Sequence, residues 1–211
     1  MLARPDPQAS LEATGLAAGP SGRRLFAGVD LKVDAGEALY VAGPNGTGKT
    51  TLLRVLCGLA EPLAGRVSRR GHHLSYIGHA PALKDDLSAH ENLRVNALVS
   101  GFRVTDEDVG RALGRFGLAS RASVPARALS QGQRRRVSLA RLALTRQPGL
   151  LVLDEPFTAL DADAADVLAQ ALEERLQSGS LLIYTTHQPR RLAARAHHTL
   201  RLGRGAMQEP C

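Results

Sequence analysis

ALYVAGPNGTGKTTLLRVLCGL, residues 38–59, is the stretch of sequence that decides the fold. The apolar run 38–42 predicts a buried strand, and the glycine-rich segment 43–49 predicts a loop. Apolar residues then recur at helical spacing over 50–59, which predicts a helix that ends near Gly58. Strand, loop and helix follow one another in the order that a phosphate-binding site needs.

The loop itself matches a known phosphate-binding pattern, because residues 43–50 read G-x-x-x-x-G-K-[ST]. Glycines in such a loop let backbone N–H groups converge on phosphate oxygens, and the following helix adds its positive N-terminal end. Lys49 would neutralise phosphate charge, and the Thr50 hydroxyl would ligate Mg²⁺. The predicted nucleotide-binding residues are Gly43, Pro44, Asn45, Gly46, Thr47, Gly48, Lys49, Thr50 and Thr51.

A second motif, LLVLDE at residues 150–155, places two carboxylates after a run typical of a fully buried parallel strand. Open α/β sheets bind ligands at the carboxyl ends of their strands. Asp154 would hold Mg²⁺ there, and Glu155 would act as the general base for an attacking water. An acidic pair after a strand can also merely cap the next helix. In combination with the phosphate loop, the pair favours nucleotide hydrolysis.

Predicted strands and helices alternate along the rest of the chain. Strands are expected at 25–33, 74–77 and 181–185, and helices at 162–177 and near 190–196. Residues 88–146 are mostly helical in pattern, with breaks expected at Gly101, Gly110, Gly117 and Pro125. This alternation predicts an α/β fold with a mainly parallel sheet, in a single domain over 1–211 with a helical lobe at about 88–146.

The composition argues against several classes of protein. The chain has 211 residues, a formal net charge of +7, 44% hydrophobic residues and 22% charged residues, which are ordinary values for a globular protein. No aromatic residues interleave its arginines as a base-stacking surface would require, so nucleic acid is not an expected partner. Cys57 and Cys211 make no disulfide framework. No apolar run reaches the roughly 18 residues of a transmembrane helix.

A third motif distinguishes among the many enzymes that share the first two. Residues 129–133, LSQGQ, precede a helix-compatible run and resemble the LSGGQ signature of ABC ATPases, with Gln131 in place of its first glycine. Ser130 and the backbone at Gly132 would lie at a helix N-terminus and could present donors to a γ-phosphate. Taken alone, the same residues also describe an ordinary serine-capped helix.

The order of the motifs strengthens the resemblance to ABC ATPases. After the Asp-Glu strand come Ala159-Leu160-Asp161, like the family's D-loop, and His187, like its switch histidine. The resemblance implies an ABC-type nucleotide-binding domain whose sheet is mainly parallel, with an N-terminal antiparallel part. It implies that Lys49, Glu155 and His187 serve catalysis, and that Asp161 makes a contact between protomers. It also implies a homodimer in which the signature residues of one copy, Ser130, Gln131, Gly132 and Gln133, close over ATP held by the other.

Two positions depart from the family's usual pattern. No aromatic residue lies in 16–24, where the family usually stacks adenine, so base selectivity is open. At the Q-loop, where a glutamine normally follows the third strand, the chain has His79. His79 as a neutral imidazole could take over the role of the glutamine, or it could only face the membrane partner. The sequence leaves both interpretations open.

Several short segments of the sequence resemble those of one group within the family, the ATPase subunits of bacterial cytochrome c maturation. The similarity lies in Gly78-His79, in 133–141, in 154–161 and in 185–189. It implies two integral-membrane permease subunits, a peripheral place on the cytoplasmic face of the inner membrane, and haem handled by the complex rather than bound here. The alternatives are another small ABC exporter, of lipid, drug or metal, and a non-transport ABC ATPase acting on nucleic acid. The latter would carry long coiled coils between Lys49 and Asp154.

Overall fold

The structure, a computed structural model, describes residues 10–20, 23–70, 73–144, 147–187 and 198–203. The chain divides into two units. The first unit comprises residues 1–76, 147–155 and 175–211, and the second comprises 77–146 and 156–174. The helix predicted near 190–196 lies outside the described residues.

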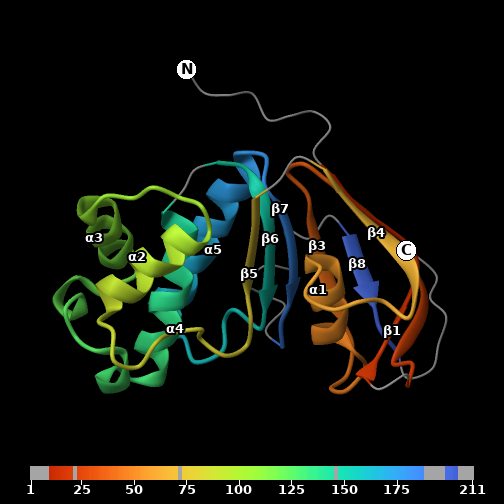
Figure 1. Cartoon of the computed structure of the whole chain (residues 1–211), viewed down its shortest axis with the longest axis horizontal. Coiled ribbons are helices and arrows are strands. Elements are labelled where there is room, and N and C mark those ends of the chain that lie inside the picture. Colours follow the sequence, from red (N-terminus) through yellow and green to blue (C-terminus); the bar gives the residue numbers. More distant parts are fainter. Residues whose placement is uncertain (1–9, 21–22, 71–72, 145–146, 188–197, 204–211) are drawn as a thin grey trace. The chain divides into compact units, whose positions relative to one another are not determined.

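A five-stranded sheet forms the centre of the first unit (Figure 1). Its strands, in spatial order, are β5 (His73–Ile77), β6 (Gly149–Asp154), β7 (Leu181–Thr185), β3 (Ala38–Ala42) and β8 (His198–Arg201). The four strands from β6 to β8 run parallel. Every residue of β6 and β7 is buried, which is why both segments read as continuous apolar runs. The predicted mainly parallel sheet is confirmed.

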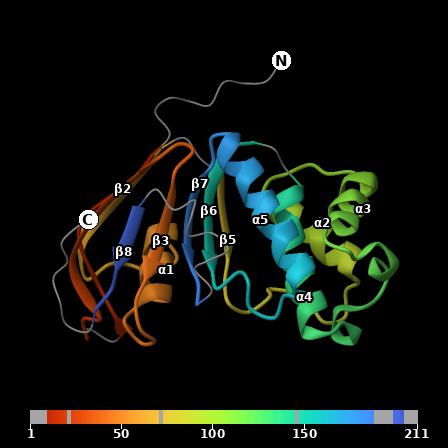
Figure 2. The same ribbon diagram turned by 180° about the vertical axis from the view of Figure 1, so that it is seen from behind.

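The first unit also contains a three-stranded antiparallel sheet, seen from behind in Figure 2. Its order is β2 (Phe26–Asp34), β1 (Ser10–Ala18) and β4 (Ala64–Arg70). This sheet confirms the antiparallel part that the family resemblance implies. The sequence pattern did not predict β1, which carries register shifts after Ala13, or β4, which is exposed and rich in arginine. Strands are recognised in a sequence by alternating apolar and polar residues. The bulges in β1 and the solvent exposure of β4 remove this alternation.

Helix α1 (Lys49–Cys57) joins the two sheets into one core. It ends at Gly58, which adopts φ 72° and donates its N–H to the carbonyls of Arg54 and Val55. The buried cluster takes residues from both sheets and from α1, among them Leu11, Leu16, Val33, Leu52, Leu53, Leu56, Val152 and Ile183. Burial raises the pKa of the Cys57 thiol to about 12, so this cysteine acts as an apolar packing residue.

Three helices of the second unit begin in the same way. Helices α2 (Ala89–Val99), α3 (Asp106–Arg115) and α4 (Gln131–Ala140) each start with a reciprocal capping box. The paired residues are Ser88 with Glu91, Thr105 with Asp108, and Ser130 with Gln133. These helices fall within 88–146, as predicted. None of the helices in the described part of the chain is long and apolar enough to cross a bilayer.

Short 3₁₀ turns and one long helix complete the second unit. The turns cover Ala119–Arg121, Ala126–Ala128 and Arg141–Ala143, and residues 162–174 belong to α5 (Ala162–Gln177). The break predicted at Gly110 is wrong, because this glycine lies inside α3. The cap at Thr105 and the buried Val109, Ala112 and Leu113 outweigh the roughly 1 kcal/mol that a helical glycine costs.

The loop before α2 is tied down by Asn92, whose side chain is buried. Its amide oxygen accepts the N–H of Lys84 at 2.8 Å, and its amide nitrogen donates to the carbonyls of Lys84, Leu87 and Ser88 at 2.9–3.0 Å. One buried side chain thus contacts four backbone groups of residues 84–88, and its carbonyl partners also accept backbone N–H groups.

We therefore expect Asn92→Ala to lower the free energy of unfolding by about 1–3 kcal/mol, since the hydrogen bonds of the buried amide are lost and the Lys84 N–H loses this acceptor. Urea denaturation measures this change. Asn96→Ala is the matched control, because the half-buried Asn96 donates only to the Asn92 carbonyl one turn back. Equal stability losses for the two variants would contradict the role of Asn92.

Candidate functional site

The phosphate loop gains its shape from residues with unusual backbone conformations. Gly43 follows β3 directly and adopts φ 147°. A Cβ atom at Gly43 would lie 2.4 Å from the carbonyl oxygen of Leu202, so no other residue fits there without a shift of the backbone. Gly48 adopts φ 98° and is the N-cap of α1. The buried Thr47 donates its hydroxyl to the Pro44 carbonyl at 2.9 Å, which closes the loop on itself.

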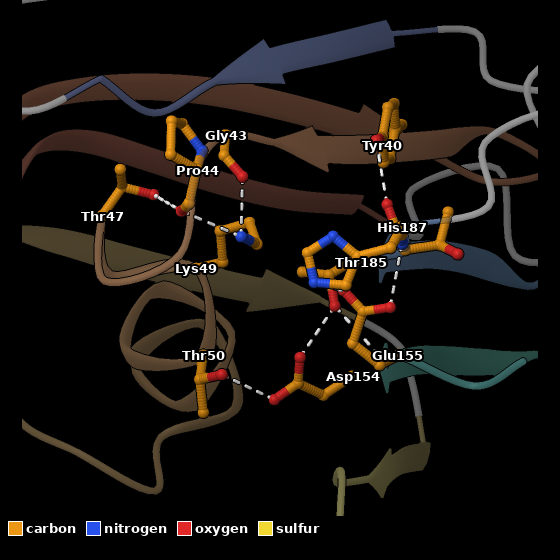
Figure 3. A network of polar contacts seen from close by, with 11 residues as sticks. Tyr40, Gly43, Pro44, Thr47, Lys49, Thr50, Asp154, Glu155, Thr185 and His187 are labelled. Atoms are coloured by element: carbon orange, nitrogen blue, oxygen red, sulfur yellow. Dashed lines mark hydrogen bonds and ion pairs between the residues drawn. The ribbon is translucent and has the colours of Figure 1, made fainter. Parts of the chain in front are cut away.

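Two positive features converge on this loop. The Lys49 ammonium donates to the carbonyls of Gly43 and Pro44 at 2.7 and 3.1 Å, as the dashed lines in Figure 3 show. The first hydrogen bond of α1 runs from the Leu52 N–H to the Gly48 carbonyl. The N–H groups of the preceding turn and the helix dipole therefore favour an anion at the loop.

A row of hydrogen bonds starts at the first turn of α1 and crosses the carboxyl ends of β6 and β7 (Figure 3). The Thr50 hydroxyl donates to Asp154 Oδ2 at 2.7 Å. The Thr185 hydroxyl donates to Asp154 Oδ1 at 2.7 Å and accepts the Glu155 N–H at 3.0 Å. The buried Thr185 thus links both carboxylate residues.

The oxygen atoms of Thr50 and Asp154 suit a magnesium ion. Mg²⁺ prefers oxygen ligands and is commonly bound by one or two carboxylates together with substrate phosphates. The hydroxyl of Thr50 and a carboxylate oxygen of Asp154 lie side by side next to the phosphate loop. The residues present therefore fit the ion.

The Glu155 carboxylate is held by His187. Glu155 Oε2 accepts the backbone N–H of His187 at 2.9 Å, and the imidazole Nε2 lies 3.3 Å from Oε1. The Glu155 side chain is only 12% exposed, whereas that of His187 is 62% exposed. Glu155 itself has φ 49°, a conformation that a residue other than glycine adopts only when its surroundings enforce it.

The predicted signature lies at the start of α4 in the second unit. The Ser130 Oγ accepts the Gln133 N–H at 3.2 Å, and the Gln133 side chain accepts the Ser130 N–H at 2.9 Å. A Cβ atom at Gly132 would lie 2.8 Å from the Ala159 carbonyl oxygen, so the signature helix and the predicted D-loop touch where only glycine fits. Gln131 is exposed. Asp161 Oδ1 accepts the Ala164 N–H at 2.8 Å, at the start of α5.

The predicted Q-loop position is held by an arginine of the signature helix. His79 is exposed, and its carbonyl accepts a hydrogen bond from Arg135 Nη1 at 3.3 Å. Arg135 is 2% exposed as a residue, and its guanidinium also donates to the carbonyls of Gly78 at 2.7 Å and Pro156 at 3.3 Å. Arg135 therefore ties the predicted Q-loop to the segment after the Asp-Glu strand.

The structure thus sorts the predicted residues into two groups. The phosphate loop, Asp154, Glu155 and His187 share the first unit, whereas Ser130–Gln133, Asp161 and His79 belong to the second. Sequence reasoning missed Thr185, Tyr40 and Arg135 as members of these networks. Thr185 and Tyr40 could have been suspected as polar side chains in otherwise aliphatic strands. Arg135 could not, because it stands in a run of three arginines.

Comparison with known proteins shows which family the chain belongs to. Residues 26–158 match the ABC transporter family. The cytochrome c biogenesis ATP-binding export protein CcmA of Nitrosomonas europaea is 44% identical over 199 residues, which cover 89% of this chain and 93% of the relative. The protein of the same name from Aromatoleum aromaticum is 49% identical over 189 residues, covering 84% and 88%.

A solved structure agrees on the fold. It is a dimeric ATP-binding cassette in a post-hydrolysis state, bound to ADP and phosphate. It matches with a TM-score of 0.82 at 22% identity, over 94% of this chain and 97% of that one. The resemblance inferred from the motifs is confirmed: the chain belongs to the ABC transporter family of ATPases and, within it, to the CcmA proteins of cytochrome c biogenesis.

Proposed function

We propose that this chain hydrolyses ATP to drive an ABC exporter of cytochrome c biogenesis, with Glu155 as the general base. The observation that carries the proposal is the hydrogen-bonded row from Thr50 through Asp154 and Thr185 to Glu155 and His187, beside the phosphate loop. We take residues 1–211 as a single ABC ATPase domain.

The triphosphate would bind on residues 43–51. The Lys49 ammonium would exchange its two loop carbonyls for phosphate oxygens, which carry full negative charge and therefore form stronger hydrogen bonds. Thr50 and Asp154 would hold Mg²⁺, which when bound neutralises charge on the phosphate oxygens.

In the hydrolytic step, the Glu155 carboxylate accepts a proton from water as the water oxygen attacks the γ-phosphorus. A P–O bond forms, the bond from the γ-phosphorus to the bridging oxygen breaks, and ADP and phosphate result. The largely buried carboxylate is already oriented by the His187 N–H, so little reorganisation precedes proton transfer. The imidazole of His187, which is 62% exposed, would turn from Glu155 Oε1 toward the γ-phosphate.

Two copies of the chain would form a homodimer around two nucleotides. Each chain has one signature, so Ser130, Gln131, Gly132 and Gln133 of one copy would close over ATP held by the other. Capping of α4 does not prevent this contact, because the Ser130 hydroxyl accepts the Gln133 N–H and can still donate its own proton. Asp161 would lie at the contact between copies. The dimeric cassette with bound ADP and phosphate supports this arrangement by its similar fold.

The dimer would act on two integral-membrane permease subunits from the cytoplasmic face of the bacterial inner membrane. His79 would face these subunits at the Q-loop position. The names of the relatives, ATP-binding export proteins of cytochrome c biogenesis, support this role. Haem would be handled by the complex rather than bound by this chain, and nucleic acid is not a partner.

Glu155→Gln should keep ATP affinity while lowering the hydrolysis rate by about 10²- to 10⁴-fold, because the base is lost and the phosphate loop is intact. Phosphate release measures the rate, and titration calorimetry measures the affinity. Since the γ-phosphates persist in this variant, analytical ultracentrifugation with Mg-ATP should show it accumulating as a dimer. If Glu155→Gln hydrolyses ATP at the rate of the parental chain, Glu155 is not the general base. If the variant stays monomeric at saturating ATP, the nucleotide pocket is not shared between two copies.

Lys49→Ala should weaken ATP binding about 10- to 100-fold, because a charge-assisted contact with phosphate is lost. Calorimetric titration gives the affinity. The exposed Lys84 provides the control, since Lys84→Ala removes the same charge from a residue outside the phosphate-loop motif. Similar affinities for the two variants would contradict phosphate binding by Lys49.

Deletion of this chain from its host should abolish covalent haem in c-type cytochromes, detected by haem staining of denaturing gels. The wild-type chain should restore the stain, and Glu155→Gln should not, because the complex needs hydrolysis to turn over. Normal cytochromes in the deletion strain would refute the assignment to cytochrome c biogenesis while leaving ATP hydrolysis untouched.

A further inference from the structure

Two tyrosines form a stacked pair on adjacent parallel strands of the first unit. Tyr40 of β3 is the register partner of Tyr184 of β7. Their ring centroids lie 5.3 Å apart with an interplanar angle of 23°. Tyr184 is fully buried, so it gives the Tyr40 ring a fixed surface to rest on. The stack thereby determines where the Tyr40 hydroxyl points.

That hydroxyl donates to the carbonyl oxygen of Thr186 at 3.0 Å. The same peptide group carries the N–H of His187, which donates to Glu155 Oε2 at 2.9 Å. Because a peptide group is planar, fixing its carbonyl also fixes the direction of its N–H. Tyr40 and Glu155 therefore hold opposite ends of one rigid group, and Figure 3 shows both residues near His187.

We propose that Tyr40 is a positioning residue for ATP hydrolysis: by holding the peptide between Thr186 and His187, it orients the Glu155 carboxylate. This inference rests on the proposed role of Glu155 as general base. Tyr40 itself touches neither nucleotide nor water in this scheme, and it acts only through the peptide.

The chemistry of the hydroxyl suits this role. Burial raises the pKa of Tyr40, and the negative charge of Glu155 raises it further, while Arg201 opposes the shift. The hydroxyl therefore keeps its proton and remains a donor throughout the physiological pH range. Hydrogen bonds in series polarise one another, so the bond to the Thr186 carbonyl also strengthens the donation from His187 to Glu155.

Loss of the hydroxyl would remove the Tyr40 hydrogen bond from the Thr186 carbonyl end of this peptide. The peptide could then rotate, and the Glu155 carboxylate would sample orientations in which it does not face the attacking water. The phosphate loop would be unchanged, because Lys49 and Thr50 contact other groups. The expected consequence is a slower chemical step with unaltered ATP affinity.

Tyr40→Phe tests the proposal, since it keeps the stacked ring and removes only the hydroxyl. We expect kcat for Mg-ATP hydrolysis by the purified full-length chain to fall about 3- to 10-fold, with the calorimetric ATP affinity unchanged and the chain still folded at the assay temperature. Tyr184→Phe is the matched control, because it removes a buried hydroxyl from the same ring pair and leaves that of Tyr40 in place. Its kcat should stay near the parental value. A parental kcat for Tyr40→Phe, or a loss shared equally by both variants, would overturn the proposal.

A double-mutant cycle with Glu155→Gln tests whether Tyr40 acts through Glu155. In that background, single-turnover measurements should show less than about a twofold further loss from Tyr40→Phe, because no base remains to be oriented. An undiminished loss would mean that Tyr40 acts by another route, and the proposal would fail. The two hypotheses also fail separately: a parental rate in Glu155→Gln refutes the general base, whereas a slow Glu155→Gln beside a parental Tyr40→Phe refutes only the positioning role.

Discussion

The Thr185 hydroxyl lies between the two carboxylate residues, and the geometry of the site depends on it. It donates to Asp154 and accepts the backbone N–H of Glu155, so a single buried oxygen sets the spacing of the proposed metal ligand and the proposed general base. This contact exists because β6 and β7 are parallel neighbours whose register places Asp154 opposite Thr185. Glu155 then leaves the strand with φ 49°, and the two hydrogen bonds that it makes with Thr185 and His187 hold it in this costly conformation.

In the second unit, side chains form hydrogen bonds with backbone groups at helix starts and in loops. Capping boxes begin three of its helices. The Asn92 side chain forms hydrogen bonds with backbone groups of the loop before α2, and the Arg135 guanidinium donates hydrogen bonds to three backbone carbonyls. Such contacts define orientation more sharply than apolar packing does, because a hydrogen bond is directional.

Prediction from sequence succeeded where a local pattern carried the information. Strands β3, β6 and β7 are apolar runs, and α1 and α5 have helical spacing, so each was located to within a residue or two. It failed for β1 and β4, where a bulge and solvent exposure erase the alternation, and at Gly110, where capping and burial outweigh a weak propensity.

The sequence by itself determined the family and supplied the residues of the candidate site, because the phosphate loop, the signature and the Asp-Glu pair are recognisable as short contiguous strings. It also placed the two carboxylates at the end of a buried strand. Only the tertiary structure decided which atoms hold them. Residues 40, 50, 154 and 185 come together through the strand order β6-β7-β3 and through α1, and pairing between strands distant in sequence leaves no local pattern to read.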